Sequence, residues 1–118
     1  MQNKPVLEID EDGTKRWYLN DLLHREDGPA IVYVDGSKEW YLNGELHRTD
    51  GPAIEASNGT KSWYLNGELH RTDGPAIELS NGDKLWHLNG DEYSFEEWLK
   101  LAPLSNQEKL KLRLQYAK

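Results

Sequence analysis

Short apolar runs separated by pairs of turn-forming residues recur along this chain at a fixed interval. In the second copy, Glu-Trp-Tyr-Leu is followed by Asn43-Gly44 and then by Glu-Leu-His-Arg. An Asn-Gly pair between two such runs is the strongest short signal of a β-hairpin, because both central residues of a type I′ turn need positive φ. Asp35-Gly36 separates the preceding two runs in the same way. Each copy therefore predicts two strands, and successive hairpins predict an antiparallel meander.

The interval is 23 residues, and it is marked by Trp17, Trp40, Trp63 and Trp86. Full copies occupy 14–36, 37–59 and 60–82, and a partial copy occupies 83–93. A period of this length is typical of repeat proteins, whose units stack on their neighbours and present an extended surface. We therefore expect 1–118 to form one mainly β repeat domain, a single twisted antiparallel sheet of about eight strands.

Counting outward from two-residue turns gives an expected register. Leu42 then faces Glu45, and Tyr41 faces Leu46; across the other turn, Ile31 faces Trp40. Because side chains alternate across a sheet, Trp40 would share the core face with Ile31 and His47, and Arg48 would lie on the other face, opposite Glu39. Repetition turns these positions into rows: Trp17, Trp40, Trp63 and Trp86; Ile31, Ile54 and Ile77; Tyr18, Tyr41, Tyr64 and then His87; His24, His47 and His70; Arg25, Arg48 and Arg71. We expect the tryptophan row to hold the sheet together.

The repeat breaks after Gly90, and residues 94–118 predict a cap. Ser94 and Glu97 form a capping box, which starts a short helix that ends before Pro103. That helix would cover the open apolar end of the repeats, as a repeat protein requires. Apolar Leu110, Leu112, Leu114 and Tyr116 then alternate with polar residues along 109–116. This period of two favours a strand, although the residues have helical propensity and a helix stays the alternative.

Composition excludes several classes of partner. The net charge of −7 disfavours nucleic acid and anionic membranes, which need clustered Lys and Arg. The first residues contain no apolar run that would make a signal peptide or a membrane span, so we expect a soluble cytoplasmic protein.

No constellation for catalysis or metal binding is evident. The His-Arg-x-Asp strings that begin at His24, His47 and His70 suggest metal ligands. However, equivalent residues two strands apart lie roughly 9–10 Å from each other, too far to share one ion. We instead expect structural roles, with His47 packed on Trp40. Without cysteine, a Gly-flanked serine or a Gly-rich phosphate loop, we expect neither an enzyme nor a metal or cofactor.

The repeated unit, W-Y-L-N-G-x-L-H-R-x-D-G-P-A-I followed by a D-G or N-G turn, resembles MORN-type repeats from Lys15 to Gly90. The string H-R-x-D-G-P-A, present three times, is similar to a variant found in uncharacterised bacteriophage proteins. The resemblance implies an elongated twisted sheet and a viral origin, and it supplies no catalytic residues. Asp-Gly-Pro-Ala takes the place of the G-x-G pattern of ordinary MORN repeats, so their phospholipid binding is not carried over.

Two main classes of function remain. The first, which we favour, is a protein-binding module that inhibits a host defence protein in the bacterial cytoplasm. The second is a sponge for an anionic nucleotide signal, bound by Arg beside aromatic rings; a structural spacer is a third reading. The candidate binding residues are Arg25, Arg48, Arg71, Tyr18, Tyr41, Tyr64, His24, His47 and His70, since Tyr and Arg are enriched at binding hot spots. Open sheet edges would also allow self-association.

Overall fold

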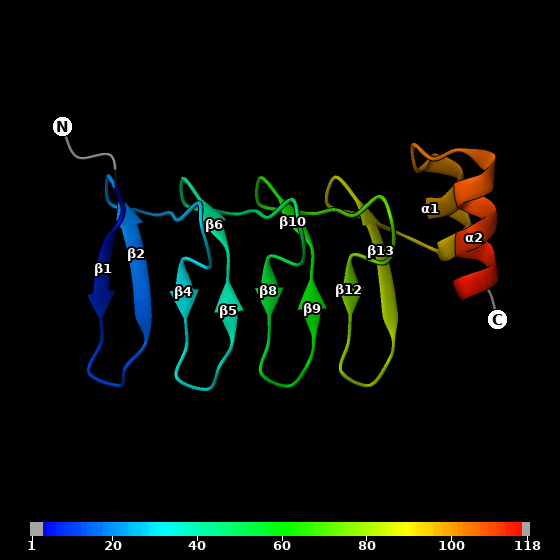
Figure 1. Cartoon of the computed structure of the whole chain (residues 1–118). Helices are drawn as coiled ribbons and strands as arrows, with labels where there is room; N and C mark the ends of the chain where they lie inside the picture. The colour runs from blue at the N-terminus through cyan, green and yellow to red at the C-terminus, as the bar shows by residue number, and fades with distance from the viewer. Residues whose placement is uncertain (1–3, 117–118) are drawn as a thin grey trace.

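The 23-residue copies lie side by side along one axis, and a pair of helices covers the C-terminal end (Figure 1). The computed structural model describes residues 4–116 and measures 47 × 32 × 20 Å. Its elements are β1 (Val6–Ile9), β2 (Lys15–Leu19), β3 (Leu22–Leu23), β4 (Ile31–Val32), β5 (Lys38–Glu39), β6 (Tyr41–Leu42), β7 (Glu45–Leu46), β8 (Ile54–Glu55), β9 (Lys61–Ser62), β10 (Tyr64–Leu65), β11 (Glu68–Leu69), β12 (Ile77–Glu78), β13 (Lys84–Leu88), β14 (Asp91–Tyr93), α1 (Phe95–Leu101) and α2 (Asn106–Tyr116). No helix within 4–116 is long and apolar enough to cross a membrane.

The fold is mainly β, an open antiparallel meander with two short C-terminal helices, which confirms the predicted fold class. The largest sheet runs in the order β1-β2-β4-β5-β8-β9-β12-β13-β14, with β3 paired to β2. The pairs β6-β7 and β10-β11 form separate two-stranded sheets. Within the described residues there are fourteen strands, more than the expected eight. Two of the additional strands arise because predicted strands are interrupted at their tryptophan, β5 and β6 at Trp40 and β9 and β10 at Trp63.

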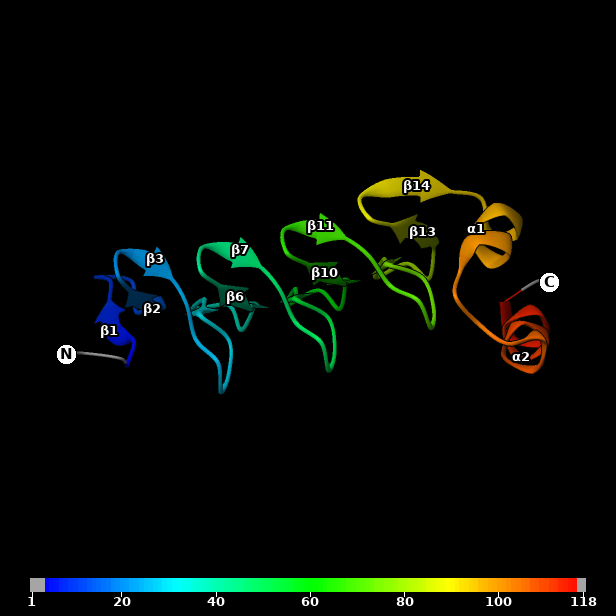
Figure 2. The same cartoon turned by 90° about the horizontal axis from the view of Figure 1, so that it is seen from above.

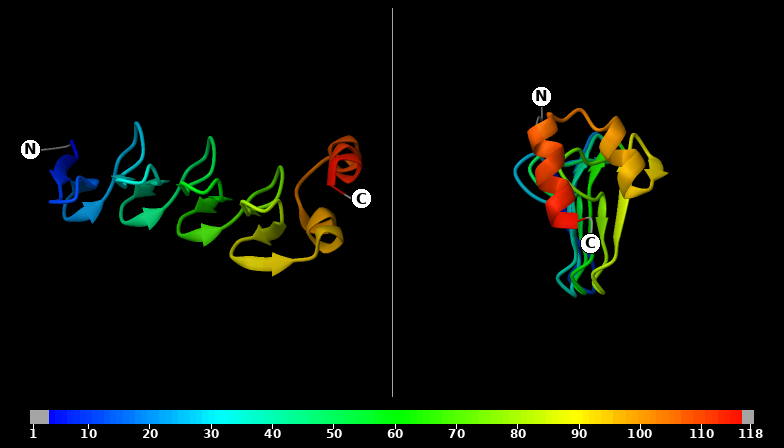
Figure 3. Two further views of the ribbon diagram at one scale, coloured as in Figure 1. Left: turned by 90° about the horizontal axis from the view of Figure 1, so that it is seen from below. Right: turned by 90° about the vertical axis from the view of Figure 1, so that its right-hand side faces the viewer.

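Each full copy therefore contributes two hairpins that point in different directions. The hairpins that contain β5 and β9 lie side by side in Figure 1. Figure 2 shows β3, β7, β11 and β14 together along one side of the molecule, directed along its length. Figure 3 gives the end view, in which the copies superpose behind the two helices.

The Asn-Gly hairpins have the predicted geometry. Asn43 and Gly44 have φ values of 50° and 82°, as a type I′ turn requires. Tyr41 pairs with Leu46 and Leu42 with Glu45, so the predicted register around this turn is confirmed.

The Asp-Gly hairpins differ from the prediction by one residue. The N–H of Tyr33 donates to Ser37 O at 2.8 Å, and the N–H of Gly36 donates back to Tyr33 O at 3.0 Å. This is a three-residue loop that closes with Gly36 at φ 93°, a common alternative to the two-residue turn. Ile31 consequently pairs with Glu39, and the prediction that it faces Trp40 is wrong.

The same loop occurs once more before the first full copy. The N–H of Asp10 donates to Thr14 O at 2.9 Å, and Gly13 has a φ of 95°. This loop joins β1 to β2, so the N-terminal segment supplies half a repeat that the sequence analysis did not predict. As a result, β1 forms the first strand of the large sheet.

The core lies elsewhere than in the predicted tryptophan row. The residues without solvent exposure in the stack include one alanine from each full copy: Ala30, Ala53 and Ala76. Trp17, Trp40 and Trp63 are only half-buried, whereas Trp86 is buried. Close packing at the alanines holds neighbouring hairpins together, and most large apolar burial occurs near the C-terminus.

The C-terminal cap encloses an aromatic cluster. Trp98 on α1 is fully buried, and its ring centroid lies 4.7 Å from that of Trp86. Phe95 and Tyr116 pack on the same Trp86 ring, and the indole N–H of Trp98 donates to Arg71 O at 3.0 Å. The cap therefore seals the last repeat, as predicted for the first helix.

The predicted capping box of α1 is confirmed, because the N–H of Glu97 donates to Ser94 Oγ at 3.2 Å. The strand predicted over 109–116 is wrong, since this segment belongs to α2. A second capping box starts α2: the N–H of Glu108 donates to Ser105 Oγ at 3.1 Å, and that of Ser105 donates to Glu108 at 2.9 Å. These two local bonds favour the helix. The alternating pattern suggested a strand with one buried face, but Leu110 and Leu114 are exposed.

Candidate binding surface of tryptophan and arginine grooves

An arginine lies over the tryptophan of its own copy in each full repeat. The guanidinium carbons of Arg25, Arg48 and Arg71 lie 3.9, 3.8 and 3.8 Å from the ring centroids of Trp17, Trp40 and Trp63. This arrangement is a cation–π contact. The sequence analysis placed Arg48 and Trp40 on opposite faces, because it continued one strand through Trp40, where the chain leaves one sheet and enters the next.

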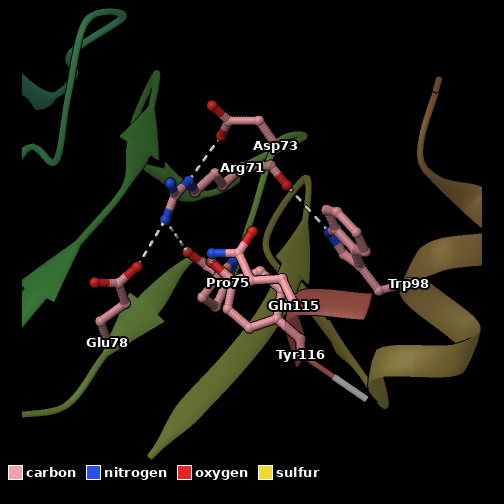
Figure 4. Close-up of polar contacts among 7 residues, drawn as sticks. All are labelled: Arg71, Asp73, Pro75, Glu78, Trp98, Gln115 and Tyr116. Carbon is pink, nitrogen blue, oxygen red and sulfur yellow. Dashed lines mark hydrogen bonds and ion pairs between the residues drawn. The ribbon is translucent and has the colours of Figure 1, made fainter. Parts of the chain in front are cut away.

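Polar contacts hold each guanidinium in place, as Figure 4 shows for Arg71. The Nε of Arg71 donates to Asp73 at 2.7 Å, and its Nη1 donates to Pro75 O at 3.0 Å and to Glu78 at 3.1 Å. The same three partners surround Arg48, namely Asp50, Pro52 O and Glu55. The expected pair between Arg48 and Glu39 is therefore wrong. Glu39 instead accepts from the hydroxyl of Tyr41 at 2.9 Å.

The histidines link consecutive copies. Nδ1 of His24, His47 and His70 accepts the backbone N–H of Asn43, Asn66 and Asn89 at 2.9, 3.0 and 2.9 Å. Arg48, not His47, stacks on Trp40, so the predicted packing of that histidine is wrong, and its structural role is to join one repeat to the next.

The tyrosines have surroundings different from those of the arginines and histidines. Tyr18, Tyr41 and Tyr64 are half-buried. Burial, with a smaller contribution from Glu39, raises the pKa of Tyr41. The N–H groups of Arg25 and Arg48 donate to Tyr41 O and Tyr64 O at 3.1 Å, so the backbones of the tyrosine and arginine rows meet. The tyrosines, predicted as binding residues together with the arginines and histidines, are nevertheless not among the residues that line the grooves described next.

Two grooves lie between consecutive His-Arg-x-Asp-Gly loops, and a third lies beside the first of these loops. The groove of the third copy, about 630 Å³, has Trp63 and His70 among its lining residues and lies between the loops that contain Arg48 and Arg71. The groove of the second copy, about 690 Å³, is lined by the equivalent residues one repeat earlier. A third, about 460 Å³, lies at the N-terminal end against Trp17, Lys4 and Pro5. We call this set the groove row.

Carboxylates dominate the exposed charge of the groove row. The side chains of Asp27, Asp50 and Asp73 are 88, 82 and 79% exposed, whereas those of Arg25, Arg48 and Arg71 are 25, 19 and 16% exposed. Arg48, by hydrogen bonding and charge, lowers the pKa of Asp50 and keeps it ionised. A ligand that enters a groove therefore meets carboxylates before it meets guanidinium groups.

Sequence reasoning missed the tryptophans and aspartates as groove residues. A signal for them was present, since each arginine follows its tryptophan by eight residues and precedes its aspartate by two in all three copies. Within residues 4–116, no group of three or more His, Asp or Glu side chains is placed to hold a metal ion.

Comparisons with known proteins find no relative of this chain. It matches no family model, no curated protein and no solved structure. Function must therefore be inferred from the residues of the groove row and from their chemistry.

Proposed function

We propose that this chain is a non-enzymatic binding protein whose groove row holds an extended, basic segment of a partner protein. The observation that carries the proposal is the recurrence of one groove, with a tryptophan and an exposed aspartate, at every full copy. Repeated sites of identical chemistry suit a ligand that is itself extended.

The charge distribution supports a basic ligand. A lysine or arginine of the partner finds an exposed carboxylate such as Asp50, and a half-buried ring such as Trp40 lies nearby in the same groove. The carboxylate offers a charge-assisted hydrogen bond through Oδ2, since its Oδ1 accepts from Arg48, and the ring offers apolar contact beside the face that Arg48 covers. The net charge of −7 also attracts a basic segment over longer distances.

The same observations disfavour the anionic nucleotide. The Nε and Nη1 of Arg48 already donate to Asp50, Pro52 O and Glu55. A phosphate would therefore share that guanidinium with two carboxylates, and the exposed Asp50 would repel it on the way in. We therefore propose a protein ligand, with the nucleotide as an alternative outcome of the test.

The repeat spacing sets the expected pattern of the ligand. Equivalent positions lie two strands apart, which is roughly 9–10 Å at the usual strand spacing. A segment in the polyproline II conformation advances about 3.1 Å per residue with three residues per turn, so three residues span one repeat and every third side chain points the same way. We propose that the bound segment carries a basic residue at every third position.

The class of partner follows from the resemblance and not from the geometry. The H-R-x-D-G-P-A strings of this chain resemble those of bacteriophage proteins, so we propose that the partner is a host defence protein in the bacterial cytoplasm. Occupation of a basic segment of that protein would inhibit it without any chemical step.

A peptide titration tests the proposal. The probe is a fluorescent peptide with lysine at every third position and serine elsewhere, and the control peptide has the same composition with its lysines adjoining. We expect the spaced peptide to bind about tenfold more tightly, and the triple variant Asp27→Asn, Asp50→Asn, Asp73→Asn to lose about tenfold, the scale of one charge-assisted contact. Thermal melting checks that the variant is folded.

Three results would overturn the proposal. Equal affinity for the two peptides would show that the chain responds only to net charge. Saturable binding of a nucleotide, measured by calorimetry on the same preparation, would favour the sponge instead; binding of neither would favour the structural spacer.

A further inference from the structure

We propose that β1 pairs with β1 of a second copy, so that two chains form a continuous antiparallel sheet across a two-fold axis at Leu7. This inference does not rest on the proposed function. It starts from the two ends of the stack, which are unlike each other.

The C-terminal end is covered and the N-terminal end is open. At the C-terminus, α1 buries Trp98 and Leu99 against Trp86. At the N-terminus, β1 is the first strand of the large sheet and pairs only with β2 among the described elements. Its side chains Val6, Leu7 and Ile9 are 55, 42 and 59% exposed. Natural proteins usually blunt such an apolar edge or pair it.

The hydrogen-bond phase of β1 decides which backbone groups are available. The N–H of Asp10 donates to Thr14 O, so this pair is one of the hydrogen-bonded pairs of the β1-β2 ladder. Such pairs alternate along an antiparallel ladder. Val6 and Glu8 therefore bond to Tyr18 and Arg16 of β2, while Leu7 and Ile9 direct their N–H and C=O groups away from β2.

Only a few registers can use these outward groups in a symmetric pair. With the axis at Leu7, the two Leu7 residues exchange two hydrogen bonds, and each Ile9 N–H donates to the Pro5 carbonyl of the other copy. Pro5 has no N–H, so this pairing leaves no donor unmet at that position.

The same register is electrostatically complementary. It places Lys4 opposite Asp10 of the second copy, and Val6 opposite Glu8. A shift by two residues would place Glu8 opposite Glu8, and like charges directly opposite each other destabilise a strand pair. The sequence of β1 therefore selects the register centred on Leu7.

The symmetry has a consequence for the grooves. The axis of an antiparallel strand pair is perpendicular to the sheet, so the same face of both copies lies on one side. The first groove, which includes Lys4 and Pro5, would lie beside its equivalent in the second copy. The dimer would thus join two groove rows into one surface of twice the length.

Cysteine cross-linking tests the register, and the full chain suits it because it has no native cysteine. Facing residues of a hydrogen-bonded pair have Cα atoms about 5.5 Å apart, within the range of a disulfide. We expect Leu7→Cys to form a covalent dimer at least about tenfold faster than Val6→Cys, whose counterpart is Glu8, since the disulfide needs that close approach. Val34→Cys, exposed on the loop between β4 and β5 and outside the predicted strand pair, measures the background from random collision.

Sedimentation equilibrium of the unmodified chain supplies the second measurement. We expect twice the chain mass at high concentration, and a shift toward the monomer in Lys4→Glu, which faces Asp10 with a like charge. A Leu114→Lys change on α2, at the other end, should leave the equilibrium unaltered. The proposal fails if the unmodified chain stays monomeric at every concentration, or if Leu7→Cys cross-links no faster than Val6→Cys.

Discussion

Nδ1 of His47 accepts the backbone N–H of Asn66, which lies 19 positions later in the next copy, at 3.0 Å. Asn66 opens the type I′ turn of its own hairpin and has a φ of 50°. The histidine of one repeat therefore holds the turn of the following repeat in place. Backbone bonds flank this contact, since the N–H of Gly67 donates to Leu46 O at 2.8 Å.

His47→Ala should lower the free energy of unfolding by about 1 kcal/mol, the usual net contribution of one hydrogen bond. Urea denaturation measures the loss, and Thr49→Ala, at an exposed neighbouring position, is the matched control. Hydrogen exchange gives a local readout, because the Asn66 amide should lose protection in the variant. Unchanged protection of that amide would show that the contact contributes nothing in solution.

Trp98→Ala should destabilise the chain more than Trp40→Ala does. Trp98 is fully buried and bonds Arg71 O, so its removal leaves a cavity and an unpaired carbonyl, at a cost of about 3–5 kcal/mol. Trp40 is half-buried, and about half that loss is expected. Chemical denaturation of the two variants gives the comparison, and an equal or reversed order would contradict the location of the core at the C-terminal cap.

Ala53→Leu should also destabilise the fold, although it adds apolar surface. Ala53 has no solvent exposure, and its backbone bonds Trp40 and Ser62, so a larger side chain must push neighbouring hairpins apart. Such overpacking costs about 1–3 kcal/mol. Ala56→Leu, at a less buried position in the same copy, is the control. A variant at Ala53 that keeps the original melting temperature would show that the alanines do not limit the spacing of the copies.

Local signals were the part of the fold that the sequence could predict. The Asn43-Gly44 turn and the Ser94 capping box each depend on a few adjacent residues, so their geometry follows directly from residue type. Asp35-Gly36 carried less information, because a dipeptide of this kind fits both a two-residue turn and a three-residue loop. The one-residue difference changed which side chains share a face.

The contacts within the groove row could not be predicted, because they do not depend on adjacent residues alone. Whether Arg48 meets Trp40 depends on the path of the chain between β5 and β6, and no residue near Trp40 signals that the ladder breaks there. The exposed leucines of α2 show a related limit: Leu110 and Leu114 were interpreted as one face of a strand, yet neither is buried. Periodicity predicts structure only where the apolar positions are buried.

Stability should fall in acid, and part of that fall should come from the loops that join the paired strands. Backbone hydrogen bonds from Thr14 and Ser37 lower the pKa of Asp12 and Asp35. A carboxyl group whose pKa is lower in the folded chain contributes stability above its unfolded value, about 3.9, and that contribution is lost as the pH falls through the folded value. The effect should therefore be complete at neutral pH, begin to weaken near pH 4, and disappear once the pH is below the lowered pKa values of the folded chain.

The equivalent loops of later copies supply the test variant. Asn58 and Asn81 stand at this position, and each accepts the N–H two residues later at 2.9 Å. An asparagine keeps that bond without a titrating group, so the double variant Asp12→Asn, Asp35→Asn should match the original chain in acid and lose a little stability at neutral pH. Its urea midpoint should therefore depend less on pH between neutrality and acid. An unaltered pH dependence would assign the acid loss to other carboxylates, of which Asp50, bonded to Arg48, is the first to replace.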